Sequence, residues 1–486
     1  MGNGVLSPRR SLSLTEALAP VVAMGVLFGV GTLLQDSGSE LLVLVILGAA
    51  AVATVSAVRV GGTWDDVQRS AGHKLTGALP AIFILLAIGM LIGTWVLSGT
   101  IPAMVHLGLQ LVDPRFLVLT AFLATAAMSL CTGTSWGSAG TLGVALMGMA
   151  QALDAPLAPV AGAVVSGAYF GDKLSPLSDS TNICAIGAGA DLYRHVRHML
   201  YTAGPSFLLA SAVYGLTTLP AEDGGLPARA ATLMADIERV YAFDLWLALP
   251  PLVVLVGIVA RIPAAIAITA SSAAAAAVGV WRQGFSPADA TTTAVRGFDS
   301  SMTAALGVDP GTLGEGFRGL ANRGGLESMA GVLLVVLAAF LLAGAMDVSG
   351  ALDLLVRRLL EAARGTFGLI AATMAAGATT IGLTSHGGVT ALIVGGLFQK
   401  AYADRGLAPE ALSRTLEDSV TLVEPLMPWT VSAVFMATTL GVATVELAPW
   451  AVFCWGGPLF SLALAATYDR LGFGLRRLAD DPPRPD

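Results

Sequence analysis

The stretch GAYFGDKLSPLSDSTNICAIGAG, residues 167–189, decides the fold because it sets charged and hydroxyl side chains between two apolar runs. Pro176 lies in its middle, lacks a backbone N–H and clashes with the preceding turn, so a helix through this stretch is interrupted. Within a membrane, such a break is tolerated only where protein or a water-filled cavity surrounds the freed backbone groups. The stretch therefore indicates either a polar centre inside a bundle of membrane helices or a solvated loop at the membrane surface.

The composition of the whole chain is that of a membrane protein. Of its 486 residues, 55% are hydrophobic and 12% are charged, and the mean hydropathy is +0.76. Soluble domains carry about 25% charged residues, so this composition excludes a soluble enzyme. The formal charge of −7 argues against nucleic-acid binding, which needs basic surfaces. The three cysteines lie far apart with no metal-ligand or disulfide spacing, and they are interpreted as core residues.

Ten stretches are long and apolar enough to cross a bilayer, which takes about 20 residues. They are residues 17–34, 40–58, 78–98, 115–131, 199–218, 240–260, 262–281, 328–346, 366–382 and 449–467. Shorter apolar stretches rich in glycine, serine and threonine lie at 137–153, 156–170, 387–400 and 429–447. The sequence thus predicts an all-α polytopic membrane protein with about ten to thirteen transmembrane segments, some broken or re-entrant.

Positive charges at the two ends predict the orientation. Arg9 and Arg10 precede the first span, and the last span is followed by Arg470, Arg476, Arg477 and Arg484. By the positive-inside tendency, both ends are cytoplasmic, which requires an even number of crossings. The first apolar run is long for a signal peptide and no small-residue cleavage site follows it, so we expect it to remain as a span.

The two halves of the chain resemble each other. LIGTWVLSG (91–99) matches LAGAMDVSG (342–350), GTSWGSAGTLGVAL (133–146) matches LTSHGGVTALIVGG (383–396), and SPLSDSTN (175–182) matches EPLMPWTV (424–431). A repeat in a multi-span chain is typical of transporters, whose site lies at the repeat interface near the membrane midplane. The alternative is that small-residue membrane segments look alike. The sequence does not set whether the repeats are parallel or inverted.

This repeat divides the chain into five regions. We expect N-terminal transmembrane helices over residues 1–60, a first repeat over 61–218, and connecting helices with a polar linker over 219–327. A second repeat over 328–470 and a cytoplasmic tail over 471–486 complete the chain.

The second repeat also carries a broken, acid-bearing segment, LEDSVTLVEPLMPWT, residues 416–430. Asp418 and Glu424 stand in it, and Pro425 and Pro428 break the helix. Ionisable groups in membrane segments are costly and therefore functional by default. Two broken segments at corresponding places point to a transporter site and favour the polar centre over the surface loop.

Glycine-flanked hydroxyl clusters lie in both repeats, Thr134 with Ser135 and Thr384 with Ser385. Glycine lets the backbone turn tightly, so these clusters are interpreted as tips of re-entrant hairpins or as helix breaks. The alternative is close packing of helices through small residues. His386 replaces Trp136 at the equivalent position and is either a structural residue or a proton carrier.

Two further charged features leave alternatives open. Asp347 lies inside an apolar span, and we interpret it either as a proton carrier or as the partner of a basic residue. Asp418 is a further candidate proton carrier. The stretch DLYRHVRHMLYT, residues 191–202, precedes a span and is interpreted as an interfacial anchor rather than as a ligand.

Taken together, LIGTWVLSGTIPAM, CTGTSWGSAGTLGVAL, GAYFGDKLSPLSDSTN, DLYRHVRHMLYT and LEDSVTLVEPLMPWT resemble the NhaC-type sodium/proton antiporter family over about residues 12–470. The resemblance implies secondary transport across the bacterial inner membrane and two inverted repeats with re-entrant hairpins. The family also contains exchangers of organic anions such as malate and lactate. This chain departs from the family pattern, which has serine where Glu424 stands and asparagine where Thr430 stands.

The leading hypothesis is exchange of Na⁺, or Li⁺, for H⁺ by alternating access, because a carboxylate in a partly desolvated site binds either a cation or a proton. We expect Na⁺ at Asp172 and Asp179. Further ligands are expected among oxygen-bearing side chains of both repeats, namely Thr134, Ser135, Ser175, Ser178, Thr181, Asn182, Thr384, Ser385 and Glu424. The expected partners are the lipid bilayer, Na⁺ and H⁺, with no cofactor, in a homodimer.

The second hypothesis is a sodium-coupled exchanger of an organic anion or an amino acid. Lys173 would then pair with a carboxylate of the substrate, and helix ends at the breaks would face its negative charge. The structural alternative for Lys173 is an internal salt bridge to Asp172 or Asp179. A passive channel is disfavoured because the acids stand at broken helices rather than in rings along a pore.

Overall fold

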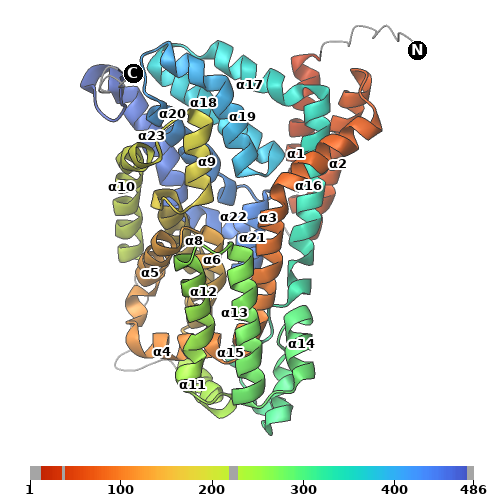
Figure 1. The fold of residues 1–486 in the computed structure, drawn as a ribbon, viewed down its shortest axis with the longest axis vertical. Coiled ribbons are helices and arrows are strands. Elements are labelled where there is room, and N and C mark those ends of the chain that lie inside the picture. Colours follow the sequence, from red (N-terminus) through yellow and green to blue (C-terminus); the bar gives the residue numbers. More distant parts are fainter. Residues whose placement is uncertain (1–11, 35–38, 218–227, 479–486) are drawn as a thin grey trace.

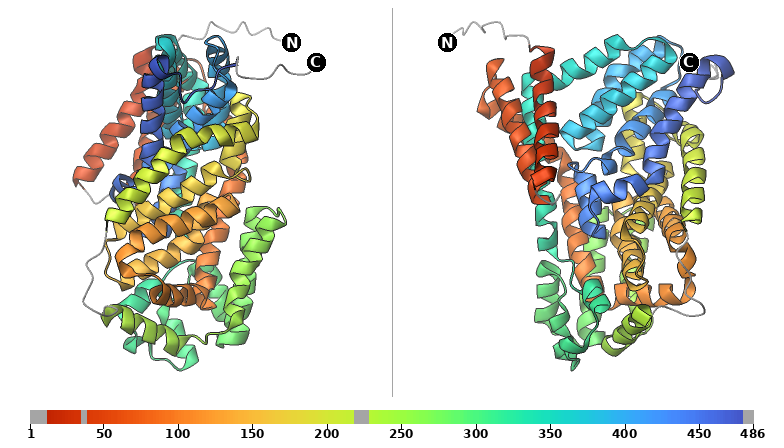
Figure 2. Two further views of the ribbon diagram at one scale, coloured as in Figure 1. Left: turned by 90° about the vertical axis from the view of Figure 1, so that its left-hand side faces the viewer. Right: turned by 180° about the vertical axis from the view of Figure 1, so that it is seen from behind.

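The computed structural model describes residues 12–34, 39–217 and 228–478, and these residues are helical almost throughout (Figures 1 and 2). Within those ranges, extended pairing is limited to two isolated bridges. The all-α membrane fold is therefore confirmed. Arg9, Arg10 and Arg484, which entered the orientation argument, lie outside the described residues. The first and last described helices begin and end at the same end of the molecule, as an even number of crossings requires (Figure 2).

Among the described residues, eight helices are long and apolar enough to span a bilayer, and up to eleven spans result if each bent pair counts as one. The unbroken spans are built on α1 (Leu14–Leu34), α2 (Ser39–Arg59), α3 (Trp64–Leu97), α5 (Leu117–Thr132), α10 (Leu192–Leu216), α13 (Ala264–Val278), α16 (Ala330–Ser349) and α18 (Gly365–Thr384). Each corresponds to one of the spans predicted from hydropathy.

The predicted span over residues 240–260 corresponds to a helical stretch over residues 245–259, which follows a sharp bend. The chain bends by 105° between α11 (Ala228–Val240) and the helical stretch 245–259 that contains α12 (Leu249–Val259). The bend has a local cause, because the Asp244 carboxylate accepts a hydrogen bond from the backbone N–H of Trp246 at 2.9 Å and starts a new helix there. The charged residues Asp236, Glu238 and Arg239 precede the turn, and the predicted apolar span begins there.

The two repeats have the same order of helices and breaks. In the first, α3 passes through Gly99 (φ 86°) into α4 (Thr100–Leu111), and in the second α16 passes through Gly350 (φ 72°) into α17 (Ala351–Ala362). The next helix of each repeat also ends on a left-handed residue, α5 on Gly133 (φ 68°) and α18 on Ser385 (φ 51°). The two halves that resemble each other in sequence therefore also have similar local backbone geometry.

The first helices of the two repeats run antiparallel against each other. Gly344 of α16 packs on Ala71 near the beginning of α3, whereas Gly89 toward the end of α3 packs on Gly325 and Met329, just before α16. Consistent with this, α4 lies at one end of the long axis and α17 at the other (Figure 1).

Close packing of α5 against α8 (Leu157–Leu174) fixes the polar centre of the first repeat. A Cβ atom on Gly167 would lie 2.4 Å from the carbonyl oxygen of Phe122, and one on Gly171 would lie 2.2 Å from the backbone nitrogen of Leu130. Because small residues let membrane helices approach this closely, the backbone of α5 sets the position of the last turn of α8. That turn carries Asp172 and Lys173.

Gly171→Ala is expected to destabilise the protein by about 1–3 kcal/mol, because the added methyl group overlaps backbone atoms that cannot move aside. The measurement is thermal unfolding of the purified protein in detergent. Gly204→Ala in α10 is the matched control, since nothing lies within 4 Å of a Cβ atom there. Equal melting temperatures for the two variants would contradict the packing argument.

Candidate functional site

The predicted helix break after Asp172 is present. The helix α8 ends at Leu174 and α9 (Asp179–Ala188) begins after a turn that contains Pro176. The Thr181 hydroxyl donates to the backbone carbonyls of Asp172 and Lys173, at 3.1 Å each. Carbonyls at the end of a helix lack hydrogen-bond partners within the helix. This threonine therefore supplies a hydrogen bond to two carbonyls that would otherwise have none.

The Asp172 carboxylate lies at the centre of this break and is 7% exposed. It accepts hydrogen bonds from the Ser135 hydroxyl at 3.2 Å and from the Ser180 hydroxyl at 3.3 Å. Ser178, which precedes α9, is hydrogen-bonded to Ser180 at 2.9 Å. Thr134 stands one residue before α6 (Ser135–Ser138) and accepts the backbone N–H of Gly137 at 3.2 Å, which orients the helix that carries Ser135. The result is a carboxylate surrounded by hydroxyl oxygens.

Glu424 supplies a carboxylate from the second repeat. It follows α20 (Pro409–Leu416) and a π-helical turn over Glu417–Thr421, and it precedes α21 (Val431–Leu440). Its Oε2 atom would lie 3.1 Å from a Cβ atom on Gly387, so the carboxylate lies against the first turn of α19 (Gly387–Ala403). The positive end of a helix favours an anion there. The charges of Glu424 and Asp172 act on each other across the repeat interface.

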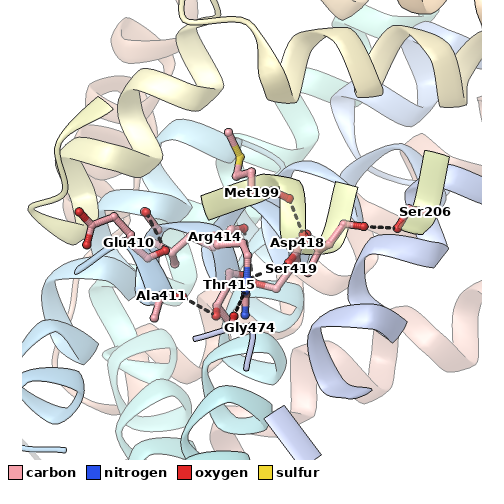
Figure 3. A network of polar contacts seen from close by, with 12 residues as sticks. Met199, Ser206, Glu410, Ala411, Arg414, Thr415, Asp418, Ser419 and Gly474 are labelled. Atoms are coloured by element: carbon pink, nitrogen blue, oxygen red, sulfur yellow. Dashed lines mark hydrogen bonds and ion pairs between the residues drawn. The ribbon is translucent and has the colours of Figure 1, made fainter. Parts of the chain in front are cut away.

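Lys173 and Asp418 form a buried ion pair between the repeats, and both side chains are fully buried. The Lys173 ammonium donates to Asp418 Oδ1, which also accepts the Thr202 hydroxyl at 3.2 Å. The Arg414 guanidinium lies 3.9 Å from Asp418 Oδ2 and donates to the carbonyl of Gly474. Figure 3 shows Arg414 and Asp418 within this network. The expected internal partners of Lys173, Asp172 and Asp179, are replaced by an acid 245 residues away.

Of the other predicted ligands of the first repeat, one is exposed and two hydrogen-bond to the local backbone, and their role as cation ligands stays a prediction. Asp179 is exposed in the first turn of α9. Asn182 donates to the carbonyls of Pro176 and Ser178, at 3.0 and 2.7 Å, and so supports the turn. The Ser175 hydroxyl accepts the N–H of Leu177 at 3.4 Å in the same turn.

The hydroxyl cluster of the second repeat stabilises the break between α18 and α19. The hydroxyls of Thr384 and Thr390 are 2.8 Å apart, and Ser385 adopts the left-handed conformation that ends α18. His386 caps α19, because its Nδ1 atom accepts the N–H of Val389 at 3.3 Å.

Asp347 pairs with α3 at the outer part of the bundle. Its carboxylate accepts the Ser70 hydroxyl at 2.7 Å and lies 3.7 Å from the Lys74 ammonium. The structure thus gives it a basic partner, which is one of the two alternatives left open by the sequence.

The interpretation of residues 191–202 as an interfacial anchor is wrong for its histidines. They belong to α10, and His195 and His198 are buried. His195 Nδ1 lies 2.6 Å from the Ser413 hydroxyl of α20, so this end of α10 packs into the second repeat. Arg194 pairs with Glu410 at 3.2 Å.

Three residues near the site were not among the residues predicted to form it. Arg414 and Glu417 are fully buried beside Asp418, and Tyr169 is buried beside Asp172 and Glu424. Arg414 precedes Asp418 by four residues, a spacing that places both on one helix face. That spacing was the available signal. Tyr169 precedes Asp172 by three residues on α8, which is a comparable signal, whereas its neighbour Glu424 comes from the other repeat.

Breaking the Lys173–Asp418 pair is expected to cost about 3–5 kcal/mol of stability, because the remaining charge stays buried. Lys173→Met and Asp418→Asn should each lower the melting temperature, and the double variant should lose less than the sum of both. Arg357→Met and Asp353→Asn, which separate an exposed pair at 2.7 Å on α17, are the matched control with effects under about 1 kcal/mol. Additive losses for Lys173 and Asp418 would show that the pair is not coupled.

The sequence is similar to known transporters along most of its length. The profile of the Na⁺/H⁺ antiporter family matches residues 167–467. An uncharacterised Na⁺/H⁺ antiporter of Haemophilus influenzae is 42% identical over 95% of this chain and 97% of its own. The Na⁺/H⁺ antiporter NhaC of Alkalihalophilus pseudofirmus is 32% identical, over 86% and 87%. The malate-2H⁺/Na⁺-lactate antiporter of Bacillus subtilis is 30% identical, over 87% of each.

The matched region contains both broken segments, with Asp172 and Lys173 in one and Asp418 and Glu424 in the other. The resemblance drawn from these motifs is confirmed. On the extent of the match and the identity of its relatives, the chain belongs to the Na⁺/H⁺ antiporter family.

Proposed function

We propose that this chain exchanges Na⁺, or Li⁺, for protons by alternating access across the bacterial inner membrane. The observation that carries the proposal is the buried Asp172 carboxylate at a helix break, which accepts hydrogen bonds from the hydroxyls of Ser135 and Ser180. Carboxylate and hydroxyl oxygens are hard ligands that suit a small cation. No cofactor is needed, because the gradients of the two ions supply the energy.

Competition at Asp172 accounts for the exchange. A buried carboxylate is unstable as a bare ion, so it holds either a cation or a proton. Arrival of Na⁺ therefore expels the proton, and arrival of a proton expels Na⁺. Glu424, which stands where the family pattern has serine, lies close enough for its charge to act on Asp172.

Inverted repeats are the proposed basis of alternating access. The antiparallel packing of α3 and α16 supports this, as do the positions of α4 and α17 at opposite ends of the molecule (Figure 1). In such transporters the site lies between the repeats, and rocking of one repeat against the other exposes it to each side in turn. The homodimer expected from the sequence stays a prediction.

Exchange of an organic solute is the second candidate, favoured by the malate and lactate named for one relative. The engagement of Lys173 by Asp418 weighs against it, because that ammonium was the proposed anchor for a substrate carboxylate. A cavity of about 610 Å³ is present, but it is lined by linker residues such as Arg296 and Arg323 and by the end of α21. None of the candidate ion-binding residues lines it.

The test of the proposed function is transport in proteoliposomes with a trapped pH-sensitive dye and an imposed proton gradient. Addition of NaCl or LiCl alone is expected to collapse the gradient, and KCl is not. Malate, lactate and basic amino acids are then added separately. A proton gradient that is stable in NaCl and collapses only with an organic solute would overturn ion exchange in favour of the second candidate.

Asp172→Asn is expected to lower Na⁺-driven proton movement by at least about 10²-fold, since the neutral amide has no negative charge for Na⁺ and no proton to exchange for it. Asp179→Asn is the matched control seven residues along the chain. Because Asp179 is exposed, its variant should keep transport close to that of the native protein. The reverse ranking of the two variants would move the cation site to Asp179.

A further inference from the structure

Glu417 is a buried acid without a role in the exchange described above. It is the first residue of the π-helical turn between α20 and Glu424, and its side chain is fully buried. Neither of its carboxylate oxygens has a hydrogen-bond partner among the residues the structure describes. Burying an ionised carboxylate without partners costs several kcal/mol in proteins, so this side chain requires a proton or a neighbouring cation.

The groups that face Glu417 come from both repeats. From α8 come Lys173 and Asp172, from α9 comes the Cys184 thiol, and from its own turn comes the Thr421 hydroxyl. Lys173 is the cation among them, and it is already bonded to Asp418, the residue after Glu417. One buried ammonium is therefore within the electrostatic reach of two consecutive acids.

Lys173, Arg414, Asp418 and Glu417 form a buried cluster whose own charges balance only when Glu417 is ionised, and an ionised Asp172 beside it adds one further negative charge. Lys173 and Arg414 are two buried cations, and Asp418 is the acid that both contact. With a proton on Glu417 the cluster carries one net positive charge, and without that proton it is neutral. The cluster can therefore exist with Glu417 in either state, which an isolated buried carboxylate cannot do.

We propose that Glu417 is a second proton-binding residue of the transport cycle and that it competes with Asp418 for Lys173. The proposal rests on the proposed function and adds a proton to it. When Glu417 holds a proton, the ammonium stays on Asp418, as in this structure. When the proton leaves, the new charge attracts the ammonium away from Asp418.

Movement of Lys173 would reach the cation site directly. Lys173 follows Asp172 in the last turn of α8, and the Thr181 hydroxyl binds the carbonyls of both residues at 3.1 Å. A shift of the lysine therefore pulls on the backbone that positions the Asp172 carboxylate. Coupling of this kind is reciprocal, so Na⁺ at Asp172 also changes the affinity of Glu417 for its proton.

The test is the number of protons exchanged per Na⁺. Proteoliposomes are prepared with a fixed Na⁺ gradient and a fixed membrane potential, and the external pH is varied until the dye shows no net flux. That null point gives the ratio independently of how fast each protein turns over. We expect Glu417→Gln to exchange one proton fewer per Na⁺ than the native protein, and Glu417→Asp, which keeps a carboxyl group, to keep the native ratio.

Glu410→Gln is the matched control. Glu410 is also a buried acid of the same helical segment, but it lies in ion pairs with Arg194 at 3.2 Å and Arg476 at 3.8 Å. Its variant should keep the native ratio. If the Glu417→Gln protein does not fold, Glu417→Met makes the same test, since an apolar side chain of similar volume removes the cost of burying polar atoms.

The outcomes separate this proposal from the proposed function. An unchanged ratio in the glutamine or methionine variant, or a ratio lowered equally by Glu410→Gln, overturns the role of Glu417 while Na⁺/H⁺ exchange stands. Absence of Na⁺-driven proton movement in the native protein overturns the exchange itself, and the role of Glu417 falls with it.

Discussion

A helix that breaks inside a membrane must find partners for its own backbone, and the polar centre of this protein is built around that constraint. Thr181 and Thr430 stand at matching places in the two aligned segments. The first donates to the carbonyls of Asp172 and Lys173, and the second to those of Glu424, at 2.5 Å, and Met427, at 3.0 Å. Each threonine stabilises a break, and each break holds an acid at the interface between the repeats.

The same constraint explains why the sequence predicts the breaks well. Proline, glycine and hydroxyl residues act within a few positions of where they stand, so their effect can be read locally. Gly99, Gly133 and Gly350 all adopt the left-handed conformation that their place after an apolar run suggests. The internal repeat adds strength to this local evidence, because each break has a counterpart in the other half.

The contacts between the repeats could not be predicted in this way. Lys173 pairs with Asp418 over 245 residues, and His195 meets Ser413 over 218, so no spacing in the sequence encodes either contact. The exposure of Asp179 has a similar origin. It belongs to the same polar segment as Asp172, but the turn around Pro176 directs the two carboxylates into different surroundings. Choosing among the acids of one polar segment requires knowing what the other repeat places beside each of them.

The glycines of α8 have a mechanical consequence. Gly167 and Gly171 bring the backbone of α8 into contact with that of α5, and the Ser129 hydroxyl of α5 donates to the Ala168 carbonyl of α8 at 2.5 Å. Two helices in backbone contact cannot slide past each other by small rotations of side chains, because their backbone atoms would collide. The two helices therefore move together as one rigid unit, with Asp172 in the last turn of α8. Any sliding of helices during the transport cycle must take place on the other faces of α5 and α8.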